Sequence, residues 1–464
     1  MSRPRLALIH PRFRYPSGDL PIGIASLAAW VRRELPLQVA VHDASFQPGL
    51  GPARRFLERF RPDIVGIGSS TLMTPDALAI AALAKGIGAR VVLGGPHPTL
   101  HARATLDHEP NVDAVIVGEG ERSLTALLER WLAGEWDAPP AGVVWRTPAG
   151  HIEQGPPRAP ILCLDQLPLP AWELLPMRSY LRAWGKLDHL QPGLTGANVS
   201  ASRGCPHRCT FCQPTLTKLF GRKLRQRSPE HLVHELTALH RRYGVGGFWF
   251  TDDTFTARPH WTQAFCEAYR ASGLGLPWGC TSRADALEPA LIRTMADAGL
   301  RRLGVGLEAA SERIREGVYA KGTTVEQVRE ALAHSREYGV HGFVFLMLGA
   351  PGESLSEMLQ TIHLAAELPA HDASFSLCVP LPGTALHQRL VDQGVSLSNR
   401  HRDYDYYARQ PFEQGLPGWA LRSLQYYGWA RFYLEPWRSR SVLRTAVRPA
   451  GWRAGAHRLR RLLP

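Results

Sequence analysis

The sequence lacks the long apolar runs, signal segments and paired cysteines that are typical of membrane and secreted proteins. No stretch can span a bilayer, and the apolar run in the N-terminal MSRPRLALIHPRF is too short for a signal peptide. There are seven cysteines, an odd number. Three lie together and four are scattered, at Cys163, Cys266, Cys280 and Cys378. This spacing excludes a disulfide framework and favours a metal site in a reducing compartment, so we predict a cytoplasmic protein.

Other absences narrow the class further. The chain has no short internal repeat and no long low-complexity tract, and charged residues make up only 20%, so broad disorder is not expected. Its 464 residues, 44% of them hydrophobic, are enough for two or three domains. The net charge of +13 is compatible with nucleic acid, an anionic membrane or phosphate-bearing ligands. Because no helix-turn-helix, RNA-recognition or zinc-finger signature is present, we predict no nucleic-acid partner, and a nucleic-acid-binding regulator is the remotest functional alternative.

Residues 1–135 alternate short apolar runs with amphipathic helical patterns. The predicted strands are Arg5–His10, Gln38–His42, Ile64–Gly68, Arg90–Leu93 and Ala114–Val117. The helical patterns between them include Gly23–Arg33, Ala53–Phe60 and Thr74–Lys85. Such alternation with apolar strands predicts an α/β domain with a doubly wound parallel sheet.

Ligands of such sheets bind at the carboxyl ends of the strands. The residues predicted there are Ser69, Ser70, Thr71, Gly94, Gly95, Pro96, His97, Gly118 and Glu119. Gly94 and Gly95 would let the backbone approach a large planar ligand, with bare N–H groups free to meet its polar atoms. The alternative is that the two glycines only form a tight turn between strand and helix.

The rest of the chain divides into three parts. Residues 136–195 are rich in Pro and Gly and predict a small hairpin and a linker. Residues 196–385 alternate again, and their six strand–helix units predict a partial barrel. Its strands are expected at Ala197–Ser202, Gly247–Thr251, Trp278–Ser282, Leu303–Leu307, Phe343–Leu348 and Ser374–Val379, with helices such as Pro229–Tyr243 and Val325–Tyr338. Residues 386–464 are expected to form a mainly helical extension with a basic tail.

Three cysteines carry the chemistry. Cys205, Cys209 and Cys212 lie in SRGCPHRCTFC, directly after the first predicted barrel strand. Three thiolates on one short loop can hold three irons of a 4Fe–4S cubane and leave the fourth iron open for a ligand. A Cys3His zinc site with His207 is the alternative, but closed zinc sites usually combine ligands from two separate elements.

With this loop the sequence resembles the radical-SAM superfamily, in which CxxxCxxC is the signature and Phe211 occupies the usual aromatic place. The resemblance implies that the open iron chelates S-adenosylmethionine (SAM) and that reductive cleavage yields a 5′-deoxyadenosyl radical. It also implies an electron donor of the flavodoxin or ferredoxin type.

The resemblance continues at the later strands, where it implies SAM contacts. Those contacts would come from Phe211, from Asp252 and Asp253 in FTDDTF, from Arg283, Glu308 and Lys321, and from Gly349 in FLMLGAPGE. The two aspartates could instead cap a turn or helix after their strand. For Arg283, Glu308 and Lys321, a structural salt bridge is an equally good interpretation.

The whole layout resembles radical-SAM proteins with an N-terminal cobalamin-binding domain. The matching pieces are PIGIASLAAWVR, RPDIVGIGSST, VVLGGPHPT and DAVIVGEGE, and with the barrel and the DQLPLPAW linker they span residues 1 to about 390. The nine edge residues and Leu72 would then contact cobalamin, and Leu72 and Met73 are the candidates for facing the cobalt. The DxHxxG motif that supplies a cobalt ligand elsewhere is absent. Methylthiotransferases are excluded because residues 1–162 contain no cysteine.

The resemblance implies a methyltransferase that moves a methyl group from methylcobalamin to a substrate radical, with the cofactors supplying the chemistry. A cobalamin-using cyclase or rearrangement enzyme without net methylation is the alternative. The substrate is a small molecule that the sequence does not identify. From Trp429 onward the sequence contains nine arginines and one acid, together with Trp437 and Trp452, and we predict that this tail contacts an anionic membrane. A solvated basic tail, or a helix packed on the barrel, is an equally good interpretation.

Overall fold

The computed structural model describes residues 3–13, 18–212, 215–398, 400–405, 410, 412 and 415–440. The chain forms two compact units. The first comprises Met1–Ala183 and Gln213–Arg225, and the second comprises Trp184–Cys212 and Gln226–Pro464. The N-terminal unit is therefore discontinuous in sequence, because it includes a short segment that follows the last cysteine of the CxxxCxxC loop.

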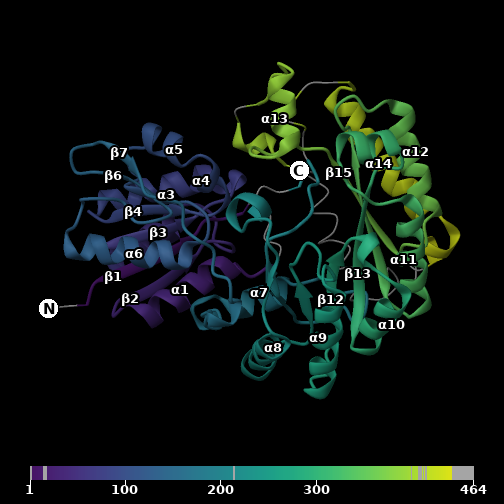
Figure 1. The fold of residues 1–464 in the computed structure, drawn as a ribbon, viewed down its shortest axis with the longest axis horizontal. Coiled ribbons are helices and arrows are strands. Elements are labelled where there is room, and N and C mark those ends of the chain that lie inside the picture. Colours follow the sequence, from purple (N-terminus) through teal and green to yellow (C-terminus); the bar gives the residue numbers. More distant parts are fainter. Residues whose placement is uncertain are drawn as a thin grey trace. The chain divides into compact units, whose positions relative to one another are not determined.

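A seven-stranded sheet forms the centre of the first unit, in the order β2-β1-β3-β4-β5-β6-β7. The five parallel strands are β1 (Arg5–His10), β2 (Gln38–Asp43), β3 (Ile64–Gly68), β4 (Arg90–Gly94) and β5 (Ala114–Ile116). Their apolar residues are buried because helices cover both faces of the sheet (Figure 1). The doubly wound parallel sheet predicted from the sequence is confirmed.

The helices of this unit follow the predicted amphipathic segments. They are α1 (Ile22–Glu34), α2 (Gly51–Phe60), α3 (Thr74–Gly86), α4 (Pro96–Leu100), α5 (Ala102–His108), α6 (Gly120–Ala133) and α7 (Met177–Ala183). On one face, α2, α3 and α5 pack with the sheet into a continuous apolar core that includes Leu57, Ile80 and Leu106. Helices α1 and α6 pack against each other. The face that each helix buries therefore follows from its apolar stripe.

The predicted hairpin extends the sheet rather than forming a separate linker element. It consists of β6 (Val143–Arg146) and β7 (Ile152–Gln154), and β6 pairs antiparallel with β5. Val144 and Trp145 are buried, so the hairpin contributes to the core of the first unit. Helix α7 is anchored to the same unit because the Tyr180 hydroxyl donates to Asp43 Oδ2 at 2.5 Å and to Ser45 Oγ at 2.9 Å.

The second unit contains six parallel strands in the order β15-β14-β13-β12-β11-β8. They are β8 (Ala197–Val199), β11 (Phe248–Phe250), β12 (Trp278–Ser282), β13 (Leu300–Glu308), β14 (His341–Leu348) and β15 (Asp372–Leu377). Neighbours in the sheet are consecutive strand–helix repeats, and β8 and β15 are its edges, so the predicted partial barrel is confirmed. The helices between the strands are α8 (Pro229–Tyr243), α9 (Pro259–Ala271), α10 (Pro289–Asp297), α11 (Val325–Glu337) and α12 (Leu355–Glu367).

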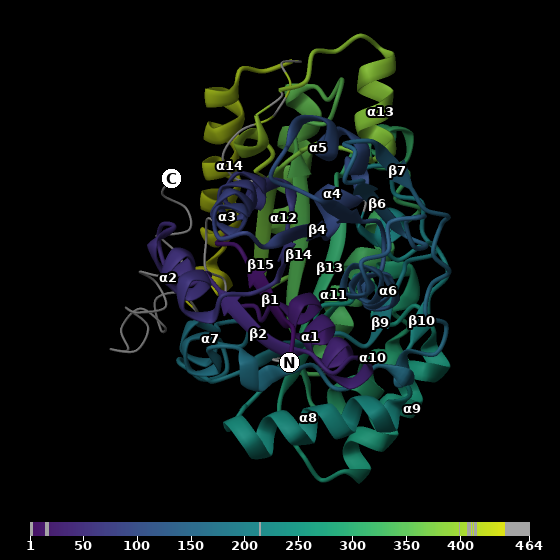
Figure 2. The ribbon, with the colours of Figure 1, turned by 90° about the vertical axis from the view of Figure 1, so that its left-hand side faces the viewer.

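The C-terminal extension is helical, as predicted, and it packs on the barrel. It contains α13 (Ala385–Asp392) and α14 (Gly418–Tyr433), and α14 lies beside α12 and β15 (Figures 1 and 2). Arg438 follows α14 and is buried. Its guanidinium donates to the carbonyl oxygens of Ala366 and Ala370, at 2.8 and 2.9 Å, and so caps the C-terminal end of α12.

This packing changes the interpretation of the basic tail. Arg431 forms an ion pair with Glu435 at 2.5 Å, and the side chain of Trp437 lies against Arg336 and Arg438. The segment from Trp429 to Arg438 therefore belongs to the barrel, because its cations and its indole already have protein partners. The tail that begins at residue 441 lies outside the described residues. Within the described residues, no helix combines the length and apolar character that a bilayer span requires.

Candidate functional site

The three-cysteine loop leaves the carboxyl end of β8 and is held by hydrogen bonds to the barrel. The Thr210 N–H donates to the Tyr319 carbonyl at 2.9 Å, and the Thr210 hydroxyl donates to the Val318 carbonyl at 2.6 Å. Phe211 packs edge-on against Tyr319, with ring centroids 5.0 Å apart. Phe211 thus anchors the loop in this structure, and its predicted contact with SAM stays a prediction.

The thiols of this loop fit a polycationic cluster. Burial raises the pKa of Cys205 and of Cys212, and the negative charge of neighbouring groups, including Cys209, raises both further. Three thiolates can lie together only if cations neutralise them, and cluster iron does so. Among the described residues no three His, Cys, Asp or Glu side chains are grouped as ligands of one metal ion, whereas each thiolate of a cubane binds a separate iron.

Arg283 lies beside the loop at the end of β12. Its guanidinium donates to Cys209 Sγ at 3.4 Å and holds both carboxylate oxygens of Asp285, at 3.0 and 2.7 Å. The guanidinium is buried, so its charge acts on the sulfur with little screening. Sequence reasoning named Arg283 but not Asp285, which fixes the orientation of the guanidinium.

Glu308 and Lys321 form a buried ion pair, with Lys321 Nζ 2.8 Å from Glu308 Oε1. Both lie over Gly306, where a Cβ atom would stand 2.3 Å from Glu308 Oε1 and 2.6 Å from Lys321 Nζ. The register of β13 against β14 shifts between Gly306 and Glu308, and Glu308 has a φ of +71°. A bulge and a strained residue of this kind are typical of functional sites.

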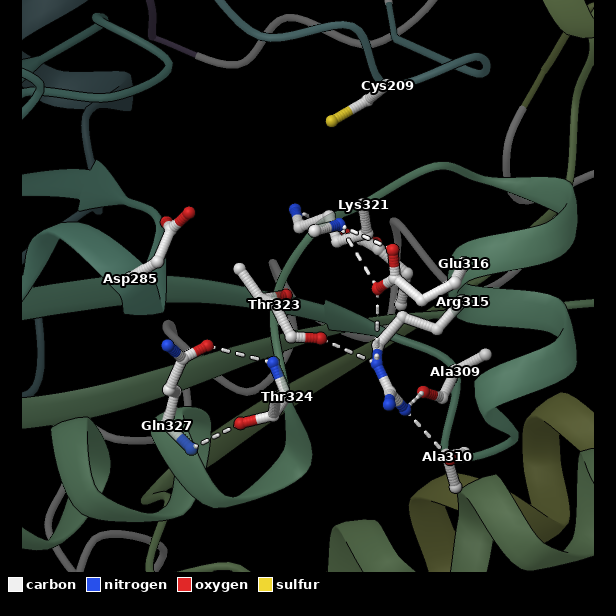
Figure 3. Close-up of polar contacts among 12 residues, drawn as sticks. Cys209, Asp285, Ala309, Ala310, Arg315, Glu316, Lys321, Thr323, Thr324 and Gln327 are labelled. Carbon is white, nitrogen blue, oxygen red and sulfur yellow. Dashed lines mark hydrogen bonds and ion pairs between the residues drawn. The ribbon is translucent and has the colours of Figure 1, made fainter.

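The loop that carries Lys321 is fixed by Arg315, a residue that the sequence did not single out. The Arg315 guanidinium donates to the carbonyl of Thr323 at 2.7 Å and to those of Ala309 and Ala310 at 3.1 and 2.9 Å (Figure 3). It therefore joins the end of β13 to the Lys321 loop. Lys321 Nζ lies 5.8 Å from the centroid of the Phe211 ring, and the negative charge of Cys209 contributes to the raised pKa of Lys321.

The two aspartates of FTDDTF differ in their surroundings. Asp252 is buried, accepts from the Ala201 N–H at 2.9 Å and from the Ser202 hydroxyl, and so fixes the chain just before the cysteine loop. Asp253 is exposed as a residue, but protein atoms surround its carboxyl group. This desolvation and the charge of Asp252 raise the pKa of Asp253 to about 6. Asp253 is therefore the aspartate that can face a ligand, while Asp252 has a supporting role.

The loop after β14 is organised around a buried carboxylate. Glu353 Oε2 accepts from the N–H groups of Gly349 and Ala350, at 2.7 and 2.8 Å, and burial raises the pKa of Glu353 to about 7. Gly349 has a φ of +79°, and its carbonyl oxygen accepts a hydrogen bond from Gln410 Nε2 at 2.6 Å. The backbone at Gly349 is thus held rigidly, and its predicted contact with SAM stays a prediction.

In the first unit, the carboxyl ends of β3, β4 and β5 are joined to one another. The Ser69 N–H donates to the Gly94 carbonyl at 2.9 Å, and His97 Nδ1 lies 3.3 Å from Thr71 Oγ1. Gly95 has a φ of +99°, and a Cβ there would lie 2.8 Å from the Ser69 carbonyl oxygen. The tight turn between strand and helix therefore accounts for Gly95 without a ligand.

This edge nevertheless offers backbone to a ligand. Seven of the predicted cobalamin contacts are partly exposed there: Ser70, Thr71, Leu72, Gly94, Gly95, Pro96 and Gly118. Among the described residues, the only atom within 4 Å of a Cβ added at Gly94 is the Ile116 Cβ at 3.8 Å, so the described part of the chain leaves space beside this backbone. The Gly118 N–H is bound by Thr99 Oγ1 at 3.2 Å. An edge of exposed backbone fits a large, amide-rich cofactor.

Protein groups contact both carboxylate oxygens of Glu119, and its predicted contact with cobalamin stays a prediction. Its carboxylate accepts from the Ile161 N–H at 3.0 Å and forms an ion pair with Arg225 at 2.5 Å, and both side chains are buried. Sequence reasoning missed Arg225, since the two residues lie far apart in the chain. Three of the four cysteines outside the loop are buried: burial raises the pKa of Cys266 and of Cys378 to about 12 and that of Cys280 well above its usual value, so these three favour the neutral thiol. Cys163 is exposed.

Known families match both units. Residues 199–365 match the family model of the radical SAM superfamily, and residues 19–128 match that of the B12 binding domain. The chain is thus a radical SAM protein with a B12 binding domain, and 4Fe–4S, SAM and cobalamin are its cofactors.

Relatives refine this assignment. An uncharacterised methyltransferase of Pyrococcus horikoshii is 33% identical over 392 residues, which are 83% of this chain and 81% of that protein. An anaerobic magnesium-protoporphyrin IX monomethyl ester cyclase of Rubrivivax gelatinosus is 26% identical over 84% of this chain and 70% of its own length. The structure of the methyltransferase TsrM from Kitasatospora setae, with cobalamin and a 4Fe–4S cluster, superposes with a TM-score of 0.70 at 18% identity, covering 84% of this chain and 75% of that one. The chain belongs to the cobalamin-dependent radical SAM methyltransferases.

Proposed function

We propose that this enzyme transfers a methyl group to an unactivated carbon of a small-molecule substrate, and that Cys205, Cys209 and Cys212 hold its cluster. The observation that supports the ligand assignment is the gathering of buried cations around the three thiols. Arg283 donates to Cys209 Sγ, and the buried Lys321 is close enough to Cys209 for their charges to interact. When bound, the cluster supplies the electron that cleaves SAM and cobalamin carries the methyl group.

The chain's own residues bind SAM and orient it. In this proposal Asp253 accepts from the SAM ammonium, while Lys321 and Arg283 offer cationic partners to its carboxylate. Glu308 holds the Lys321 ammonium in place through their 2.8 Å ion pair. The backbone at Gly349, fixed by Glu353, supplies fixed polar groups for the adenine. The electron donor is proposed to be of the flavodoxin or ferredoxin type.

A membrane is a second proposed partner, and α14 supports it together with the tail. Trp419 and Leu434, 74% and 72% exposed, lie on the outward face of α14 and at its end, and Tyr426 is exposed between them. After Arg440 the sequence contains six further arginines and no acid: Arg444, Arg448, Arg453, Arg458, Arg460 and Arg461. Aromatic and apolar side chains followed by a cationic segment suit the surface of an anionic bilayer.

The function is tested with anaerobically reconstituted full-length protein, SAM labelled on its methyl group, and reduced hydroxocobalamin. We expect one 4Fe–4S cluster per chain, which dithionite bleaches, and transfer of the label to the cobalamin as measured by mass spectrometry. Cys205→Ala, Cys209→Ala and Cys212→Ala should each abolish the cluster, because each removes the anchor of one iron.

Cys266→Ala is the matched control, because this buried thiol lies outside the loop and should leave cluster content unchanged. Loss of the cluster in the control to the same degree would refute the ligand assignment. SAM cleavage without labelling of the cobalamin would favour the cyclase-like alternative over methyl transfer.

A further inference from the structure

The segment that follows Cys212, the last cysteine of the three-cysteine loop, belongs to the first unit, whereas Cys212 itself belongs to the second. The chain leaves the second unit after Cys212 and enters the first unit for Gln213–Arg225. Within the first unit, residues Thr215–Leu219 pack against α4. The Leu219 carbonyl oxygen approaches to 3.6 Å from the position of a Cβ on Gly118. A short covalent path therefore leads from a proposed cluster ligand to the strand ends where cobalamin is proposed to bind.

A buried ion pair between Arg225 and Glu119 connects the end of this segment back to the same strand ends. Arg225 Nη2 lies 2.5 Å from Glu119 Oε1, and the two side chains are 2% and 6% exposed. Glu119 is adjacent to Gly118, at the carboxyl end of β5. We call Gln213–Arg225 the crossing segment. The ion pair thus connects Arg225, its last residue, to the loop that carries Gly118.

The surrounding hydrogen bonds make this link stiff. Arg225 also donates to the carbonyls of Ile161 and Phe220, each at 2.7 Å, while Glu119 accepts from the Ile161 N–H at 3.0 Å. The guanidinium and the carboxylate therefore each hold backbone as well as each other. A shift of the Gly118 loop has to move residues 220–225 with it, because the two side chains are buried and losing these contacts would leave buried polar groups unsatisfied.

We propose that Glu119 and Arg225 are positioning residues that couple cobalamin binding to the cluster loop. A ligand that fixes the Gly118 loop also fixes the crossing segment, and this segment continues covalently into Cys212. The inference rests on the proposed cofactor sites. Because such coupling is reciprocal, the cluster must change the affinity for cobalamin by the same factor as cobalamin changes the binding of the cluster.

The test uses the full-length chain with and without the reconstituted cluster and with hydroxocobalamin as the probe. For the wild type we expect the Kd of hydroxocobalamin to be about tenfold lower when the cluster is present. Hydroxocobalamin should also alter the EPR spectrum of the reduced cluster and slow hydrogen exchange in a peptide covering residues 217–225. In Glu119→Gln and in Arg225→Met both cofactors should still bind, but the Kd ratio should fall to about one and the EPR change should disappear.

Two further variants keep the test decisive. Arg130→Met removes an exposed cation that pairs with Glu135 and Asp137 in the same unit, and it should keep the wild-type Kd ratio. If the single variants do not fold, Glu119→Gln combined with Arg225→Met leaves no unpaired buried charge and takes their place. Wild-type coupling in the variants, or a Kd ratio of one in the wild type, would overturn the inference. Failure of the wild type to bind either cofactor would instead overturn the proposed function.

Discussion

At Gly306 the absence of a side chain makes room for two charged groups. Glu308 and Lys321 meet above it, where an added Cβ would contact the ends of both side chains. These ends are flexible, so a methyl group there would displace the ion pair without unfolding the strand. The position therefore controls the geometry of the pair more than the stability of the barrel.

Gly306→Ala should slow reductive SAM cleavage on the order of 100-fold, because a displacement of about 1 Å in a positioned group can have that effect. Methionine release from SAM in the presence of dithionite measures it, and cluster content should stay at the wild-type value. The matched control is Gly317→Ala, since no atom lies within 4 Å of a Cβ at that position. Equal rates in the two variants would contradict the assigned role of the Glu308–Lys321 pair.

The sequence predicted site residues that belong to a spaced motif and missed those defined by tertiary contacts. Cys205 and Glu308 lie after or at the ends of strands that the alternation of strands and helices located correctly, and Lys321 lies in the loop before α11. Arg315 acts through backbone carbonyls five to eight residues away, and no side-chain pattern marks a backbone acceptor. For Glu119 the strand end was predicted correctly, but its partner Arg225 lies in a segment of the first unit that is separated in sequence from the rest of that unit.

At the scale of elements, three imidazoles lie against one another at the start of the barrel strands. His341 begins β14, His371 precedes β15, and His189 precedes β8 in the chain; their ring centroids are 4.1 Å apart for His189–His341 and 4.5 Å for His341–His371. Burial, together with the charge of His341, lowers the pKa of His189 to about 3 and that of His371 to about 4. The other charged groups that act on His371 are Asp372, Arg336 and Arg438.

Acid should therefore destabilise the barrel. Below pH 6.5 the unfolded chain binds a proton at His371 that the folded chain does not bind until about pH 4, so the free energy of unfolding falls as the pH drops through this window. For one partly buried ring we expect a loss on the order of 1 kcal/mol between about pH 7 and pH 5. Denaturant titrations of the wild type and of His371→Gln at both pH values measure it.

The His371→Gln variant should show a smaller difference between the two pH values. His108→Gln is the control, because this exposed imidazole makes only a local bond to the Ala104 carbonyl. If the free energy of unfolding of His371→Gln changed with pH as much as that of the wild type, the imidazole stack would not be the source of the pH dependence.

Most of the helices and strands could be predicted from the sequence. The errors concern which strands pair with one another. Apolar runs located β1 and β3 to the residue, since a strand buried on both faces has a continuous apolar sequence. The hairpin at β6 and β7 was recognised, but its pairing with β5 was not, because a hairpin pattern does not specify the neighbour of its outer edge.

At the scale of the whole molecule, the outward face of α14 and the tail predict binding to anionic vesicles. The full chain should sediment with vesicles containing phosphatidylserine at low salt and not with neutral vesicles, because each arginine near such a surface contributes about 1 kcal/mol. A chain ending at Arg440 keeps the buried Arg438 and should lose most of this binding. Trp419→Ser combined with Leu434→Ser should weaken it as well.

Leu162→Ser is the control for these substitutions, since Leu162 is also an exposed leucine but lies in the first unit. Equal sedimentation of the full and shortened chains, or no sedimentation of either, would argue against membrane contact. The packed positions of Trp437 and Arg438 could not be predicted, because composition does not distinguish a cation that caps a helix from one that faces lipid.

The return of residues 213–225 to the first unit also sets the order in which the protein is made. Arg225 leaves the ribosome roughly 100 residues after Glu119, which at about 5–20 residues per second is a delay on the order of 5–20 s. During that time the nascent N-terminal unit has a carboxylate whose guanidinium partner has not yet been synthesised. The unit is completed only after all three cysteines of the loop have been translated, so during biosynthesis its final closure comes after the cluster ligands have emerged.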